Sequence, residues 1–254
     1  MVEGIQSILC YSRDFTYIGY CIYHYCTFHN WSYKFLPYDE GRFILRSEYQ
    51  LRQDIIFFGK LLEERGLVVA TDGNLSAKLS DGNILITPTG LPKGRLTIDS
   101  LVKINIEGKK ISGSHNPSSE YRMHIEVYKK RKDVFGIIHT HSPYASAFAV
   151  SHIPLEPVVS EAVLSNGHVP VSPYATPSTE DVPRSIAGYI KDHNSILLAN
   201  HGALAIGKSL EEAFYRAERV EYLAKVMFIS RLLGGAKPIP QEEVEKLLKN
   251  WGLK

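Results

Sequence analysis

Residues 137–143 read I-I-H-T-H-S-P and close an apolar run that begins at Phe135. A short apolar run of this kind predicts a buried β-strand. Side chains two positions apart on a strand point to the same face, so His139 and His141 are expected side by side where the strand ends. Two neighbouring imidazoles are a natural pair of metal ligands, although two ordinary histidines on a half-buried strand would give the same pattern.

A third histidine follows another apolar run, in the stretch L-L-A-N-H-G over 197–202. The glycine permits a tight turn that directs the preceding side chain, His201, away from the strand. Alone, such a histidine is more often structural. Together with His139 and His141 it supplies a third nitrogen, and three histidines with one open position are the pattern of a catalytic zinc site.

Polar residues mark the expected start of a helix over 118–132, where the chain reads P-S-S-E from Pro117 to Glu120. The N–H groups and the dipole at a helix N-terminus favour an anion there. The hydroxyls of Ser118 and Ser119 would add donors for phosphate oxygens. An ordinary N-cap followed by an acidic residue in the first turn explains the same residues equally well.

Two loops mix glycine with hydrogen-bonding side chains. Thr71-Asp-Gly-Asn74 follows the first expected helix, and Thr87-Pro-Thr-Gly90 follows an expected hairpin. Backbone N–H groups in such loops are able to hold a phosphate group. Ordinary turns have the same composition, so either interpretation fits these loops.

The remaining sequence periodicity indicates an α/β protein. Apolar residues at helical spacing predict a helix from Ser47 to Gly66, and Ser209 with Glu212 has the capping-box spacing that begins another long helix. Hairpins are expected over 74–87 and 102–111, strands over 169–172 and 195–206, and helices over 142–151, 178–193 (with Ser178 as N-cap) and 241–250. Hairpins between helices, without a Rossmann or Walker motif, predict a three-layer sandwich around a mixed, largely antiparallel sheet.

The composition is that of a globular protein, with 44% hydrophobic and 22% charged residues in a chain of 254. The net charge of +2 is too small to indicate a nucleic-acid surface. The apolar stretch from Phe15 to Phe28 falls short of the roughly 20 residues that a membrane helix needs. All three cysteines lie within the first 26 residues, an odd and clustered set that indicates free thiols. We therefore expect a cytoplasmic protein with no nucleic-acid or membrane partner.

Residues 1–46 differ from the rest of the chain. They hold all the cysteines and seven of the fifteen tyrosines, and they show neither helical nor strand periodicity. They are interpreted either as a true extension or as the result of a start codon assigned too far upstream, and the second is favoured. The functional domain is expected over residues 47–254.

Taken together and in order, the motifs resemble those of the class II aldolase family over residues 47–254. The series is G-N-x-S, I-T-P-T-G, P-S-S-E-x-x-x-H, H-T-H, P-Y-A-T, N-H-G and a terminal W-G-L. Such an ordered series is highly specific for the superfamily. The related sugar-phosphate epimerases carry aspartate after the two serines, so Glu120 favours the aldolase branch.

The resemblance implies metal-dependent, reversible aldol cleavage of a ketose 1-phosphate similar to L-fuculose 1-phosphate. The products would be dihydroxyacetone phosphate and a small aldehyde similar to L-lactaldehyde. One divalent ion per subunit, usually Zn²⁺ and otherwise an ion such as Mn²⁺ or Co²⁺, would be held by Glu120, His139, His141 and His201, with Glu120 also catalytic. The phosphate would be bound by Gly73, Asn74, Thr89, Gly90, Ser118 and Ser119, with Thr71 nearby.

The aldehyde side departs from the family pattern. Where the family has a tyrosine before P-Y-A-T, this chain has V-V-S-E-A over 158–162, and Pro177 replaces a phenylalanine. Trp251 replaces a C-terminal tyrosine. Glu161 and Trp251 are therefore the expected aldehyde-side residues. The family forms homotetramers with sites near subunit interfaces, so these residues would reach a neighbouring subunit's site.

Three other functions remain open on the sequence alone. A pentulose-5-phosphate 4-epimerase would use the same metal and recapture the aldehyde fragment. A dehydratase acting on methylthioribulose 1-phosphate would release water instead of breaking a carbon–carbon bond. A non-catalytic interaction module of the same fold would have lost its metal ligands, whereas all four are present here.

Overall fold

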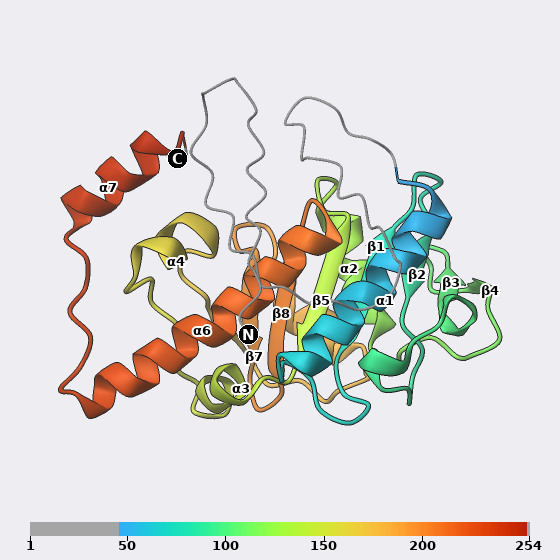
Figure 1. Cartoon of the computed structure of the whole chain (residues 1–254), viewed down its shortest axis with the longest axis horizontal. Coiled ribbons are helices and arrows are strands. Elements are labelled where there is room, and N and C mark those ends of the chain that lie inside the picture. The colour runs from blue at the N-terminus through green and yellow to red at the C-terminus, as the bar shows by residue number, and fades with distance from the viewer. Residues whose placement is uncertain (1–45, 253–254) are drawn as a thin grey trace, which may run out of the picture. The chain divides into compact units, whose positions relative to one another are not determined.

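The computed structural model describes residues 46–252, which fold around a single mixed sheet (Figure 1). The interpretation of residues 1–46 therefore falls almost wholly outside the described residues. The sheet has eight strands in the order β4-β3-β2-β1-β5-β8-β7-β6, and each neighbouring pair is antiparallel except β6 and β7. The strands are β1 Asn74–Lys78, β2 Ile84–Ile86, β3 Val102–Ile104, β4 Lys110–Ser112, β5 Gly136–Thr140, β6 Val171–Ser172, β7 Ser195–Leu198 and β8 Gly202–Gly207.

Helices cover both faces of this sheet, which confirms the predicted three-layer arrangement. The described helices are α1 Glu48–Glu64, α2 Tyr121–Lys130, α3 Pro143–Val150, α4 Ser160–Ser165, α5 Asp181–Ile186, α6 Leu210–Leu232 and α7 Gln241–Asn250. Figure 1 shows α1 and α6 lying across one face, where they pack on Leu75 and Ile138. On the other face, α2 and α5 pack on Ile137 and Leu204. Residues 137 and 138 face opposite ways because side chains alternate along a strand.

The first long helix begins and ends where its sequence predicts. The Ser47 hydroxyl accepts a hydrogen bond from the Gln50 backbone, and the Gln50 side chain accepts one from the Ser47 backbone at 2.9 Å. Gly66 follows with φ +66°, the left-handed conformation that glycine adopts without strain. At α6 only half of the predicted capping box forms, because the Glu212 carboxylate accepts from Lys208 instead of the N-cap Ser209.

Three elements differ from the sequence prediction. The helix expected from residue 118 begins at Tyr121, so both serines precede it. The helix expected over 178–193 is limited to α5, and Ser178 has φ +65° where an N-cap requires an extended conformation. The short helix α4 was not predicted, since six residues carry too few apolar positions to show a period.

No helix between residues 46 and 252 combines the length and the apolar character that crossing a membrane requires.

Close backbone packing at the start of β5 gives a test of this architecture. A Cβ atom at Gly136 would lie 2.5 Å from backbone atoms of Ser209 and Leu210, where α6 begins. Gly136→Ala is therefore expected to lower the free energy of unfolding by about 1–3 kcal/mol, the usual cost of overpacking. Urea unfolding would measure it, with Gly188→Ala as the control because a Cβ there meets nothing within 4 Å. Equal stability of the two variants would contradict this packing.

Candidate metal centre

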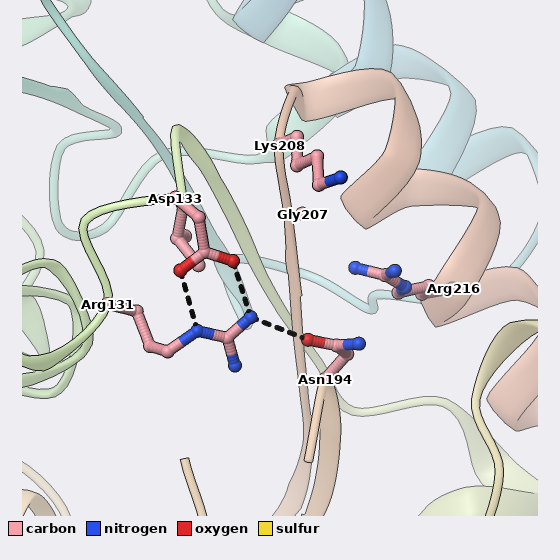
Figure 2. A pocket seen from close by; sticks show the side chains of 7 residues that line it. Arg131, Asp133, Asn194, Gly207, Lys208 and Arg216 are labelled. Carbon is pink, nitrogen blue, oxygen red and sulfur yellow. Dashed lines mark hydrogen bonds and ion pairs between the residues drawn. The ribbon is translucent and has the colours of Figure 1, made fainter. Parts of the chain in front are cut away.

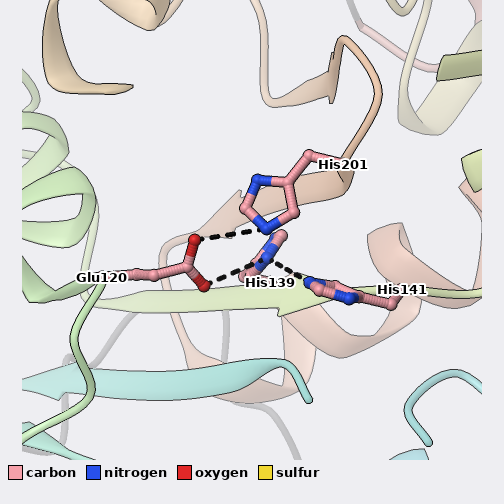
Figure 3. A group of neighbouring side chains, drawn as sticks. All are labelled: Glu120, His139, His141 and His201. Atoms are coloured by element: carbon pink, nitrogen blue, oxygen red, sulfur yellow. Dashed lines mark hydrogen bonds and ion pairs between the residues drawn. The ribbon is translucent and has the colours of Figure 1, made fainter. Parts of the chain in front are cut away.

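Four side chains from three segments of the chain converge at one end of the sheet (Figure 3). His139 is in β5 and His141 follows that strand, while His201 lies in the turn between β7 and β8. Glu120 is the residue immediately before α2. His139 is a register partner of both Asn74 in β1 and Leu204 in β8, so the centre lies on the middle strands.

The ligand atoms of these four residues all lie within 4.8 Å of one another. The His139 Nε2 atom is 2.8 Å from His141 Nε2 and 3.3 Å from Glu120 Oε2. The His201 Nε2 atom is 3.3 Å from Glu120 Oε1. The spacing predicted for His139 and His141 on one strand face is therefore observed, and Glu120 and His201 complete the group.

The hydrogen bonds around the cluster show that it fits a cation. His139 Nδ1–H donates to the Ala203 carbonyl at 2.9 Å, which leaves the Nε2 lone pair pointing into the cluster. Asp72 lies 3.5 Å from His141 Nδ1, on the outer side of that ring. Within the described chain, Glu120 Oε1 is buried without a hydrogen-bond partner. Three nitrogens and a carboxylate with lone pairs directed at one point are the donor set of a divalent metal site.

Burial keeps His139 and His141 in the protonation state that binds a metal. It lowers the pKa of His139 well below the usual value and also lowers the pKa of His141, and repulsion between neighbouring imidazoles adds to both effects. Neutral imidazole is the form that binds a metal ion. Burial raises the pKa of Glu120, and attraction to His201 partly opposes this rise. The carboxylate is thus more basic than an exposed glutamate.

A buried chain of hydrogen bonds holds Glu120 from behind. Asn74 Nδ2 donates to Glu120 Oε2 at 2.9 Å, and Asn74 Oδ1 lies 2.5 Å from His124 Nε2. The other ring nitrogen of His124 is 2.6 Å from the Ser76 hydroxyl, which is 2.9 Å from the Tyr128 hydroxyl. Because an amide oxygen only accepts, His124 Nε2 carries the proton and Nδ1 accepts from Ser76. Each partner is thereby satisfied, and one Glu120 oxygen is fixed.

The loop 71–74 touches the cluster at three successive residues. Asp72 is beside His141, and Asn74 binds Glu120. Between them, Gly73 has φ +71°, and a Cβ there would lie 2.7 Å from the His139 carbonyl oxygen. Only glycine fits this position, because both the conformation and the close approach exclude a side chain.

Gly202 has a different role from the one its sequence position predicts. The positive φ of the β7–β8 turn falls on Asn200, at +56°, and not on the glycine. Gly202 instead packs against the Thr140 carbonyl of β5, where a Cβ would clash, and it lies next to the rings of His139 and His141. The glycine is needed for close approach of β8 to β5, while Asn200 tolerates the left-handed turn and accepts a hydrogen bond from the His152 ring at 2.7 Å.

The residues predicted to bind phosphate lie in three segments that hydrogen bond to one another. Ser118 N donates to the Thr87 carbonyl at 3.0 Å, and Thr89 N donates to the Asn116 carbonyl at 3.2 Å. Thr89, Gly90 and Ser119 are exposed, while Asn74 and Ser118 are buried. The N–H groups of Glu120 and Tyr121 both bond back to Ser118, so the helix start offers fewer free donors than the sequence predicts.

Within the described chain, the two predicted aldehyde-side residues make no polar or ring contact with the four residues of the candidate metal cluster. Glu161 is exposed in the first turn of α4, and Trp251 is 68% exposed just after α7. The helices α4 and α7 pack on each other. Between residues 46 and 252, no hydrogen bond, ion pair or ring contact joins Glu161 or Trp251 to the four cluster residues. Their role therefore stays a prediction.

A small hollow lies at the end of β8 opposite the cluster, beside Gly207 (Figure 2). Its volume is about 50 Å³, and it is lined by Arg131, Asp133, Asn194, Lys208 and Arg216 among others. The Arg131 guanidinium is already bonded to Asp133 and Asn194, and Arg216 is paired with Glu212. Arg131 thereby joins the end of α2 to the loop before β7, and Arg216 joins α6 to the Ile206 carbonyl of β8.

Comparison with known proteins identifies the family. The family described as "Class II Aldolase and Adducin N-terminal domain" matches residues 53–228. The chain belongs to the class II aldolase family. The 5-deoxy-D-ribulose 1-phosphate aldolase of Bacillus thuringiensis serovar kurstaki is 33% identical over 201 residues, which are 79% of this chain and 94% of that protein. The 3-oxo-tetronate 4-phosphate decarboxylase of Escherichia coli K12 is 33% identical over 72% of this chain and 88% of its own.

Solved structures agree with this assignment. An L-fuculose 1-phosphate aldolase superposes with a TM-score of 0.77 at 32% identity, covering 82% of this chain and 99% of that one. The predicted family and fold class are therefore confirmed, and the protein is an enzyme of the class II aldolase type. Class II aldolases depend on a divalent metal, and the Glu120–histidine cluster is the group in the described aldolase chain that fits one.

Sequence reasoning named Asn74 only as a phosphate-binding residue and missed the support that Asn74 and the residues behind it give to Glu120 in this aldolase. The signal was present as spacing: Asn74 and Ser76 are two apart on β1, and His124 and Tyr128 on α2 follow the N-cap residue Glu120 at intervals of four. Each set lies on one face of its element. What the spacing does not show is that those two faces pack against each other.

Loss of one imidazole tests the metal centre. Wild-type aldolase dialysed after loading with Zn²⁺ is expected to retain about one ion per chain, as a site with four protein ligands should. His139→Ala should weaken binding by more than the roughly 10- to 100-fold that loss of an outer partner causes. His168→Ala, an exposed histidine paired with Glu156, is the control. Metal analysis showing equal zinc in all three proteins would contradict the assignment.

Acid unfolding tests the burial of His124. Burial lowers the pKa of His124 to about 3, whereas an unfolded chain protonates histidine near pH 6.5. Between these values the unfolded chain binds the extra proton, so stability falls as the pH falls. His124→Gln removes the group that takes up this proton. Between pH 6.5 and 4.5 in EDTA, the free energy of unfolding of the variant should therefore fall less steeply than that of the wild type. The difference between the two slopes should be up to about 1.4 kcal/mol per pH unit. An unchanged dependence of stability on pH, or the same change in the exposed His115→Gln variant, would contradict the burial of a neutral His124.

Proposed function

We propose that this aldolase catalyses reversible, metal-dependent cleavage of a ketose 1-phosphate into dihydroxyacetone phosphate and a small aldehyde. The observation that carries the proposal is the state of Glu120. One of its oxygens is fixed by Asn74, while the other is buried, accepts no hydrogen bond within the described chain and lies 3.3 Å from His201 Nε2. A carboxylate in this setting is suited to transfer a proton at the reacting carbon.

In this proposal, different residues of the chain bind the metal, transfer the proton and bind the phosphate. Glu120, His139, His141 and His201 would hold a divalent ion, which supplies Lewis-acid stabilisation of the negative charge that cleavage leaves on the substrate. Glu120, as a displaceable ligand, would give a proton to C3 after cleavage, while the C4 hydroxyl loses its proton to solvent. In synthesis Glu120 would take the C3 proton back, and its raised pKa favours this exchange.

The phosphate end of the substrate is assigned to the three adjoining segments. Gly73, Thr89, Gly90, Ser118 and Ser119 would contribute backbone and hydroxyl donors, which match phosphate oxygens. The Asn74 amide binds Glu120 and His124, so it has one Nδ2 hydrogen left to offer the substrate. Asn74 would therefore couple phosphate binding to the orientation of Glu120.

A second candidate reaction is decarboxylation of a 3-oxo-tetronate 4-phosphate. It is favoured by the match to decarboxylases at 33–34% identity and by the absence of the expected tyrosine on the aldehyde side. Both reactions break a carbon–carbon bond at the carbon next to the ketone and leave the same three-carbon phosphate to be protonated. They differ only in whether an aldehyde or carbon dioxide leaves.

Finer features of the proposal come from the family resemblance. Zn²⁺ is the proposed ion, with Mn²⁺ or Co²⁺ as alternatives, and the proposed assembly is a cytoplasmic homotetramer with sites near subunit interfaces. In such an assembly, Glu161 and Trp251 would reach a neighbouring subunit's aldehyde pocket. Their exposure on α4 and after α7 leaves them available for that contact.

Substitution of the proposed acid tests this function. Zinc-loaded wild-type enzyme should release dihydroxyacetone phosphate from one of a panel of ketose 1-phosphates, and Glu120→Gln should lower kcat by about 100-fold or more. Glu126→Gln on the same helix, whose carboxylate pairs with Lys130 at 3.2 Å, should act as wild type.

The products distinguish the alternatives in the same assay. Release of carbon dioxide from 3-oxo-tetronate 4-phosphate with no ketose 1-phosphate cleaved would favour the decarboxylase. An isomer formed from a pentulose 5-phosphate would indicate an epimerase, and loss of water from methylthioribulose 1-phosphate would indicate a dehydratase. Full aldolase activity in Glu120→Gln would refute the role given to Glu120.

A further inference from the structure

Lys93 is a buried cation behind the proposed phosphate site. It begins the short 3₁₀ helix Lys93–Arg95, and only 1% of its surface is exposed. Its ammonium donates to the Thr71 carbonyl at 2.8 Å and to the Leu91 carbonyl at 2.7 Å. Thr71 begins the loop that contains Gly73, and Leu91 follows Gly90. Lys93 therefore joins the two glycine loops through their backbones.

The charge of Lys93 has no acidic partner in direct contact. Among residues 46–252, no carboxylate lies within ion-pair distance of Lys93, although Asp72 and Glu63 are near enough to favour its charged form. Burial opposes them and lowers the pKa of Lys93 to about 8, so most molecules are charged at neutral pH. Burying a cation without a counter-ion is costly, and an apolar side chain would fill the same space without that cost.

The hydrogen bonds of Lys93 leave part of its capacity unused. An ammonium has three donors, and the described residues provide acceptors for two of them. Both acceptors are neutral carbonyl groups, which do not cancel a unit charge. An anion bound at the two loops would supply the missing negative charge, and a phosphate group is the anion that glycine loops with hydroxyl side chains bind.

We propose that Lys93 is a positioning residue for the substrate phosphate: it holds the two glycine loops together and places a positive charge beneath them. This inference rests on the proposed function only in assigning the phosphate to these loops. Lys93 acts through the loops and through its charge, and it takes no part in breaking the carbon–carbon bond. Its removal should therefore affect binding far more than turnover.

Two variants separate the charge from the hydrogen bonds. Lys93→Met removes the charge and both hydrogen bonds, whereas Lys93→Gln removes the charge and keeps an N–H donor for a loop carbonyl. Lys103→Met is the control, because Lys103 is another largely covered lysine, with 15% of its side chain exposed, and it bonds Glu48 and Asp81 away from the loops. The probe is inorganic phosphate, titrated calorimetrically into each protein at pH 7.5 with equal zinc content.

The dissociation constant for phosphate should rise by about tenfold or more in both Lys93 variants, equivalent to about 1.4 kcal/mol, and by less than about twofold in Lys103→Met. With a ketose 1-phosphate substrate, KM should rise similarly while kcat stays within about threefold of wild type. Should Lys93→Met fail to fold, Lys93→Gln gives the result. Unchanged phosphate affinity in a folded Lys93 variant, an equal loss in Lys103→Met, or a fall in kcat without a rise in KM would overturn the proposal.

The phosphate titration also separates this inference from the proposed reaction. A wild-type enzyme that cleaves no ketose 1-phosphate would refute the aldolase proposal and leave the role of Lys93 to be decided by phosphate affinity alone. Conversely, an active enzyme whose phosphate affinity is indifferent to Lys93 would refute this inference and leave the reaction intact.

Discussion

The hydrogen bond from Asn74 to Glu120 links the sheet to the helix that carries the acid, and the centre depends on it. Glu120 lies before α2 and Asn74 begins β1, so this bond of 2.9 Å sets one element against the other. The orientation of Asn74 in this bond depends on its neighbours, because His124 donates a hydrogen bond to Asn74 and Ser76 donates one to His124. A buried polar group is costly unless its partners are present, so removing one member leaves the others unsatisfied.

The sheet provides the rigid frame that this polar chain requires. His139 lies between Asn74 and Leu204 in the register of β1, β5 and β8, three strands whose apolar side chains are buried on both faces. Loop 71–74 and the β7–β8 turn then bring the remaining groups to the same end. In both places the backbone packs directly on β5, and a Cβ atom at Gly73 or Gly202 would clash with a β5 carbonyl group. Function thus depends on small residues as much as on the ligands themselves.

The two parts of the site differ in the charge that the protein itself provides. At the cluster, burial favours neutral imidazoles, and a metal ion would supply the positive charge. Below the glycine loops the protein supplies the charge itself, in the ammonium of Lys93. In the proposed ketose 1-phosphate, the phosphate is on C1 and the ketone on the neighbouring C2, so the two groups would contact adjoining parts of the site. Loop 71–74 contacts both parts, through Thr71 at Lys93 and through Asp72 and Asn74 at the cluster.

The sequence alone determined the family, the class of sheet and the four converging side chains. Alternation placed His139 beside His141, capping residues marked the start of α1, and the ordered motifs carried Glu120 and His201. Local spacing could not reveal the start of α2 at Tyr121, the left-handed Ser178, or the reason for Gly202, since each depends on packing between distant segments. Only the tertiary structure decided that the faces of β1 and α2 meet in a hydrogen-bond chain, and that the buried Lys93 ammonium bonds to both glycine loops. Periodicity reports which face a residue occupies, and the neighbour of that face is fixed by the fold as a whole.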